Sequence, residues 1–200
     1  MKRLIIILLF ISSIANAQEN FNWGLKEGMS FSRISGNPYK TFRKMGFTGG
    51  AFIQYRLSDY LNIATEAVYT EFGSLKRIKY DKGHIDRYFL QLNYIQCPLL
   101  FQFHIERFGI ELGPGYGFLL STKEVDVIDG IPYTGTNSFK KNDLNYNIGL
   151  TYGFDSRFGL NLRYTNSINP IRKMGSTIQK NNVLTLCLTF EFGEDGPFWK

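Results

Sequence analysis

The sequence predicts an all-β fold, an eight-stranded antiparallel up-and-down transmembrane β-barrel. Three observations predict it: an N-terminal export signal, eight segments in which apolar and polar residues alternate, and connections that are alternately short and long. Alternation with a period of two keeps one face of a strand apolar, whereas a helix of the same composition would scatter these residues around its axis.

Residues 1–17 have the three parts of a secretory signal peptide. Residues 1–3 carry two basic side chains, residues 4–14 are almost wholly apolar, and residues 15–17 have the small-residue sequence Ala-Asn-Ala. The apolar run is shorter than the roughly 20 residues of a transmembrane helix. We therefore expect cleavage after Ala17, a barrel domain over residues 18–192 and a short C-terminal tail over residues 193–200.

The eight alternating segments are long enough to cross a bilayer as tilted strands. The apolar face of the first carries one charged exception, Glu27. The segments cover residues 21–31, 47–57, 61–70, 90–105, 108–120, 143–154, 158–165 and 184–192.

The fourth segment changes phase part of the way along. Leu90 and Leu92 share one phase, and the apolar residues from Ile95 onwards share the other. A β-bulge near Asn93 and Tyr94 would return them to a single apolar face.

The connections between these segments alternate in length. Those at 58–60, 106–107 and 155–157 are tight turns, and those at 33–44, 73–89, 121–142 and 166–181 are long. Short turns at one end and long loops at the other are typical of a barrel in a bacterial outer membrane.

The two faces of the strands have different chemistry. The apolar face is rich in aromatic residues near the strand ends, which suits a lipid-facing exterior with interfacial aromatic belts. The polar face is small, and an eight-stranded barrel has room inside only for side chains. Three positive and three negative residues on this face are candidates for an interior charge network that fills the barrel: Lys26, Arg56, Glu66, Glu111, Arg163 and Glu191.

The long connections are basic. Contact with lipopolysaccharide phosphates or an acidic partner is one interpretation, and ordinary solvated surface with lipid-headgroup contact is the simpler one. The candidate basic loop surface consists of Lys40, Arg43, Lys44, Lys76, Arg77, Lys79, Lys82, Arg87, Arg172, Lys173 and Lys180.

No catalytic, cofactor or metal site is predicted. His84 and His104 are isolated, and no spacing pairs a nucleophile with a base. Cys97 and Cys187 lie on different predicted strands and match no zinc or redox motif. The sequence leaves open whether they form one disulfide or two free thiols. Loss of the signal peptide lowers the formal net charge from +6 to +4, and neither this charge nor export suggests nucleic-acid binding.

Five segments in order resemble the PorT-like outer-membrane β-barrel family of Bacteroidetes. They lie at 24–28, 55–59, 94–100, 113–117 and 159–164, and together they span almost all of the mature chain. The resemblance implies an eight-stranded barrel in the outer membrane. The member that gives the family its name is linked to secretion and maturation of exported proteins, a role that resemblance alone does not carry over. Residues 193–200, which follow the aromatic last strand, depart from the usual pattern.

We therefore expect a non-enzymatic, monomeric outer-membrane barrel with a largely filled interior and long extracellular loops. It would act in envelope structure, surface interaction or assistance to secretion, with outer-membrane lipids, lipopolysaccharide and envelope or secretion proteins as partners. Two alternatives stay open: a small pore or transport module, and a soluble periplasmic lipocalin-like barrel that binds an apolar ligand.

Overall fold

The computed structural model describes residues 20–35, 44–79, 85–128, 131–134, 139–155, 157–174 and 177–192. The expected signal peptide and C-terminal tail lie outside these ranges. No helix in them is long and apolar enough to cross a membrane. The strands are β1 (Phe21–Ser35), β2 (Lys44–Ser58), β3 (Leu61–Lys79), β4 (Ile85–Ile105), β5 (Phe108–Ile128), β6 (Ile131–Thr134), β7 (Asn142–Gly153), β8 (Phe158–Ser167), β9 (Arg172–Met174) and β10 (Thr177–Glu191).

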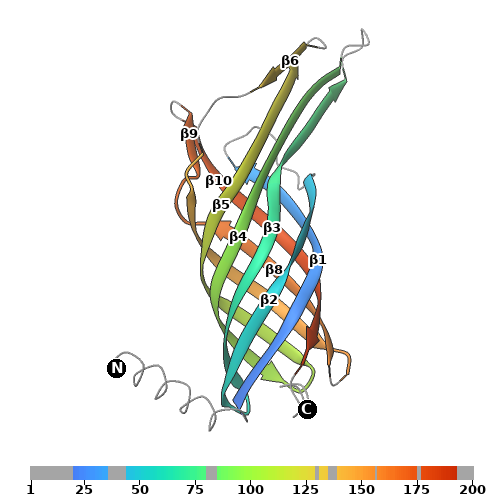
Figure 1. Cartoon of the computed structure of the whole chain (residues 1–200), viewed down its shortest axis with the longest axis vertical. Helices are drawn as coiled ribbons and strands as arrows, with labels where there is room; N and C mark the ends of the chain where they lie inside the picture. The colour runs from blue at the N-terminus through green and yellow to red at the C-terminus, as the bar shows by residue number, and fades with distance from the viewer. Residues whose placement is uncertain are drawn as a thin grey trace, which may run out of the picture.

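Eight long strands close into a ring in the order β1-β2-β3-β4-β5-β7-β8-β10 (Figure 1). Every pairing is antiparallel, and β10 pairs back onto β1, with Leu25 opposite Phe190. The short strands β6 and β9 pair with β5 and β10 above the ring. The predicted eight-stranded antiparallel up-and-down barrel is therefore confirmed.

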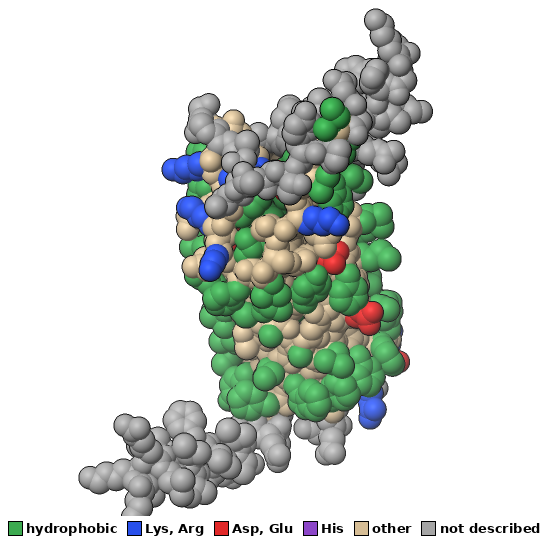
Figure 2. Space-filling view, turned by 45° about the horizontal axis from the view of Figure 1, so that its top comes forward, with side chains coloured by type: hydrophobic (Ala, Val, Ile, Leu, Met, Phe, Trp, Pro, Cys, Tyr) green, Lys and Arg blue, Asp and Glu red, His purple; other side chains and the backbone are tan. Residues whose placement is uncertain are grey.

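The barrel wall is apolar outside and largely polar inside. Along β7, for example, Asp143, Asn145 and Asn147 are buried in the interior, while Ile148 and Leu150 on the other face are more than half exposed. Figure 2 shows the hydrophobic side chains wrapping the barrel wall and several basic side chains nearer its upper end. So much exposed apolar surface would associate in water, but it is solvated by lipid.

Aromatic pairs lie on the outer face at two levels. Near the short turns, ring centroids are 4.8–5.0 Å apart in Phe21–Tyr55, Phe108–Tyr152 and Phe158–Phe190. Nearer the other end, they are 6.4 Å apart in Phe47–Tyr69 and Tyr146–Tyr164. Two such levels are the interfacial girdles of a membrane barrel.

Strand pairing continues well beyond the upper girdle. The expected loop at 73–89 is mostly a continued β3–β4 hairpin, and β5 extends through the first part of the expected loop at 121–142. These strands project past the rest of the barrel (Figure 1). Gly73, where β3 leaves the wall, has φ +151°, which L side chains rarely adopt, and a Cβ there would meet the carbonyl of Leu90.

The expectation of a single lipid-facing apolar face on β4 is wrong. The register between β4 and β5 does shift at Asn93 and Tyr94, but the additional residue is Leu120 of β5. Strand β4 keeps one phase throughout, so Leu90 and Leu92 face inward and are buried. The upper interior of the barrel is therefore apolar.

Candidate functional site

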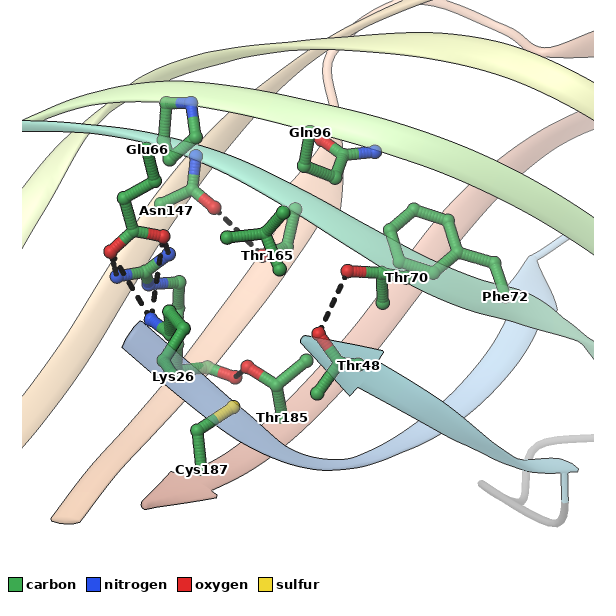
Figure 3. A pocket seen from close by; sticks show the side chains of 13 residues that line it. Lys26, Thr48, Glu66, Thr70, Phe72, Gln96, Asn147, Thr165, Thr185 and Cys187 are labelled. Atoms are coloured by element: carbon green, nitrogen blue, oxygen red, sulfur yellow. Dashed lines mark hydrogen bonds and ion pairs between the residues drawn. The ribbon is translucent and has the colours of Figure 1, made fainter. Parts of the chain in front are cut away.

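Four charged side chains from four strands meet in the middle of the barrel. Lys26 of β1, Glu66 of β3, Glu111 of β5 and Arg163 of β8 form what we call the interior quartet. Arg163 donates to Glu66 from Nη1 (2.6 Å) and Nη2 (2.8 Å), and its Nε lies 2.5 Å from Glu111 Oε1. Lys26 Nζ lies 3.1 Å from Glu66 Oε1 (Figure 3).

The quartet is electrically balanced, with two cations and two carboxylates, all largely buried. Removing these charges from water is costly unless they are paired and their remaining donors and acceptors are satisfied. Asn161 supplies part of this, since it accepts from Lys26 Nζ at 3.0 Å and donates to Glu111 Oε1 at 2.9 Å. The arrangement favours a fixed crosslink between opposite walls.

The other two predicted members of the network lie nearer the short turns. Glu191, at the end of β10, is buried and accepts a hydrogen bond from Asn22. Arg56 of β2 is half-buried, and its charge acts on Glu191. Both face the interior as expected, but the strand register separates them from the quartet.

Two small cavities flank the quartet, and Lys26 and Glu66 line both. The cavity drawn in Figure 3 has a volume of about 20 Å³ and also contacts Phe72, Gln96 and Cys187. The second, toward the short turns, has a volume of about 30 Å³ and contacts His104 and Glu191. Each has room for only one or two water molecules, so little open space lies directly beside the quartet.

An apolar cluster closes the interior above the quartet. Its side chains come from β1, β3, β4, β10 and the segment before β9, and each is at most 2% exposed: Ile34, Phe72, Leu90, Leu92, Tyr94, Ile171 and Val183. Ile171 belongs to the connection between β8 and β9, so this connection turns back into the barrel mouth. We call this group the apolar cap.

Arg172 fixes the same connection from above. Its guanidinium lies 2.8 Å from Glu124 Oε2 and 2.9 Å from Gln179 Oε1, and its Cζ lies 4.2 Å from the centroid of the Phe139 ring. Burial disfavours the charged form of Glu124, but hydrogen bonds from Arg172 and Tyr88 outweigh it and hold the pKa of this carboxyl below its usual value. The mouth is therefore closed by an ion pair lying over apolar packing.

The predicted basic surface is only partly a surface, and it is not confined to loops. Lys44 and Arg172 are buried, which corrects their assignment to exposed loops, while Lys173 is exposed and Lys180 is half-buried. Lys40, Arg43 and Lys82 lie outside the described residues, and four others are on strands β3 and β4: Lys76, Arg77, Lys79 and Arg87.

Two further exposed lysines lie at the mouth, and the sequence did not single them out. Lys140 and Lys141 precede β7, and the Lys140 amide donates to the carbonyl of Ile171 at 2.9 Å. This hydrogen bond brings the two lysines close to Lys173, which lies two residues after Ile171. In the sequence, the one signal for them was that two lysines are adjacent in the long connection at 121–142.

The remaining candidates are the two histidines and the two cysteines. His104 is buried between Asn62 and Thr151, at 3.4 and 3.3 Å, and His84 lies outside the described residues. Cys97 and Cys187 are free. Among the residues that the structure describes, no three His, Cys, Asp or Glu side chains are grouped to hold a metal ion.

Comparisons with known proteins agree with this architecture. The family model described as "Outer membrane protein beta-barrel domain" matches residues 16–173. The Neisserial surface protein A structure has a TM-score of 0.54 at 15% identity, over 85% of this chain and 97% of its own. The attachment invasion locus protein of Yersinia pestis has a TM-score of 0.51 at 16% identity, over 86% and 99%. No curated protein shows significant sequence similarity. At these identities the structures show a shared fold.

Proposed function

This chain belongs to the outer membrane protein β-barrel domain family, and from that premise we propose that it is a closed, non-enzymatic barrel that acts through its extracellular hairpins. It is an outer-membrane β-barrel protein. The proposed activity is surface contact in the envelope, with a lipid or saccharide anion of the outer leaflet as the ligand.

The observation that carries this proposal is the obstructed interior. The interior quartet crosslinks opposite walls, the apolar cap covers it, and the two cavities beside the quartet hold about 20 and 30 Å³. A solute path would require charged and apolar side chains to move apart together. With the interior filled, the chemistry available to a partner lies on the projecting strands and around the mouth.

The charge at the mouth supports an anionic ligand. Lys140, Lys141 and Lys173 are exposed there, and lysine ammonium groups bind phosphate or sulfate as compact point charges. The Yersinia pestis attachment invasion locus protein was crystallised with the heparin analogue sucrose octasulfate. We use this polyanion as a probe beside lipopolysaccharide, whose phosphates present the same chemistry.

The experiment measures binding of lipopolysaccharide and of sucrose octasulfate to the folded full chain by calorimetry at two salt concentrations. We expect salt-sensitive binding that weakens at least about tenfold in the triple variant Lys140→Gln, Lys141→Gln, Lys173→Gln. The matched control replaces Arg107 and Arg157, which are exposed at the short turns, and should bind normally. Equal weakening in both variants, or no binding by the natural chain, contradicts the proposal.

Two finer points belong to the same proposal, and two alternatives stand beside it. The signal peptide is cleaved after Ala17, which N-terminal sequencing of the mature protein checks. The chain is a PorT-like member of its family, whose partners are envelope or secretion proteins. A small pore is the second candidate, and the two cavities that flank the quartet would lie on its path. A soluble lipocalin-like barrel is disfavoured because the apolar faces point outward.

A further inference from the structure

Glu27 of β1 is a charged residue on the lipid-facing side of the barrel. Its side chain is exposed, and the next outward residues along the strand, Leu25 and Met29, are 49% and 54% exposed. No hydrogen bond or ion pair joins Glu27 to any described residue. On the described strands, Glu27 is the one charged residue that faces outward between the two girdles, so this carboxylate needs a physical reason.

The strand register places Glu27 at mid-depth. Along β1 it lies six residues beyond Phe21 of the lower girdle and six residues before Arg33, above the upper girdle. Across the strands, the paired row Tyr152–Leu160–Leu188–Glu27–Gly49–Tyr69 runs from the lower girdle to the upper one. Glu27 is three strands from Tyr152 and two from Tyr69. Counted along β1 and counted across the paired row, Glu27 therefore lies about midway between the two girdles.

The wall beside Glu27 is low. Its partner on β2 is Gly49, and the nearby outward positions on β2 and β3 are Ala51 and Ala67, which lie opposite each other. On the other side stand larger side chains, with Leu188 59% exposed. The Phe47 ring lies beside Gly49 on one side, so the carboxylate borders a shallow surface mainly at Ala51 and Ala67, where another side chain could approach the wall closely.

A carboxylate exposed to hydrocarbon is costly unless a donor or cation accompanies it. We propose that the surface around Glu27, Gly49, Ala51 and Ala67 is a lateral docking site for a second outer-membrane protein that presents a Lys or Arg at the same depth. Charge complementarity selects this occupant. This inference is independent of the proposed extracellular ligand.

A second copy of this chain does not meet the requirement. A symmetric pair centred on this surface would bring two Glu27 carboxylates together, which is unfavourable for like charges. Across the described strands, no Lys or Arg faces outward between the two girdles, since Lys26, Arg56 and Arg163 face inward and Arg33 lies above the upper girdle. A different chain must therefore supply the cation.

The test uses the full chain in intact outer membranes, with a photo-crosslinking amino acid at Ala51. The control carries it at Leu150 of β7, on the opposite wall and 56% exposed. We expect the Ala51 probe to yield an adduct with one outer-membrane protein, mapped to a lipid-facing segment containing Lys or Arg. The Leu150 probe should yield lipid adducts only. The protein adduct should fall at least about tenfold in Glu27→Leu.

Purified chains without a partner provide the second measurement. In lipid bilayers, Glu27→Leu should unfold at a higher denaturant concentration than the natural chain, because a charge leaves the lipid face. Lower stability of Glu27→Leu would show that Glu27 stabilises its own barrel, and this would overturn the proposal. Lipid adducts only at Ala51, an adduct unaffected by Glu27→Leu, or an adduct with a second copy would each overturn it too.

Discussion

Arg163 and Glu66 form a two-point ion pair across the barrel interior, with Nη1 and Nη2 of the arginine 2.6 and 2.8 Å from the two carboxylate oxygens. The two residues lie on β8 and β3, which are not neighbours in the ring. The pair therefore ties two walls together that no backbone hydrogen bond joins.

Breaking this pair on one side should strongly destabilise the barrel. Glu66→Leu or Arg163→Met leaves an uncompensated buried charge, a loss of about 3–5 kcal/mol in the free energy of unfolding. The double variant retains Lys26 and Glu111 as a neutral pair and should recover much of this loss. Urea unfolding in lipid bilayers measures all three variants as a double-mutant cycle. Additive losses would show that the pair does not act as a unit.

Gly149 makes room for the quartet. A Cβ there would lie 2.5 Å from Glu111 Oε1 and 2.8 Å from the Leu162 carbonyl. Gly149→Ala should therefore displace Glu111 and lower the free energy of unfolding by about 1–3 kcal/mol. Gly49→Ala is the control, because the closest atoms there belong to the Phe47 ring, which can rotate. Equal unfolding midpoints for the two variants would refute the steric explanation.

The Glu124–Arg172 contact should make the mouth acid-sensitive. Since the pKa of Glu124 is lowered in the folded state, its contribution to stability is complete above the ordinary value of 4.5 and is lost as pH falls through the lowered one. The natural chain and Glu124→Gln should thus differ in unfolding temperature at neutral pH, and the difference should shrink as the pH falls below 4.5. A difference in unfolding temperature that grows as the pH falls would contradict a lowered pKa of Glu124.

Trp23 reports on the lipid-facing exterior. It is 53% exposed on the outer wall and stacks on Phe192, with 4.3 Å between ring centroids. In a Trp199→Phe background, which leaves one of the two tryptophans, brominated lipids should quench its fluorescence and aqueous acrylamide should have little effect. The opposite quenching pattern would support the soluble-barrel alternative.

Sequence periodicity predicted the ring of strands correctly but did not predict the lengths of the strands. Alternation identified β7 and β8 almost to their ends, because one face of each meets lipid. It failed for the upper parts of β3, β4 and β5, where both faces leave the membrane and the alternation is no longer required. The inward direction of Leu90 and Leu92 was missed because an apolar residue on a barrel strand was assumed to face lipid.

Sequence alternation was limited in the same way for the charged residues of the interior. Period two placed all six candidate charged residues, including Lys26 and Glu191, on the inward face, but it did not single out Asp143, which is also buried in the interior. Which of them meet depends on the stagger between neighbouring strands, and alternation contains no information about stagger. Glu191 and Glu66 therefore share a face but lie at different depths. The role of Arg172 depends on a connection that turns back into the mouth, and no local pattern indicates that.

The closed interior is tested most directly by single-channel recording of the purified full chain in planar bilayers. The obstructed interior leads us to expect no stable current steps from the natural chain, because the quartet and the apolar cap leave cavities of only about 20 and 30 Å³ beside the ion pairs. Stable steps from the natural chain, with a conductance that changes in Glu66→Gln, would contradict a filled barrel and establish the pore.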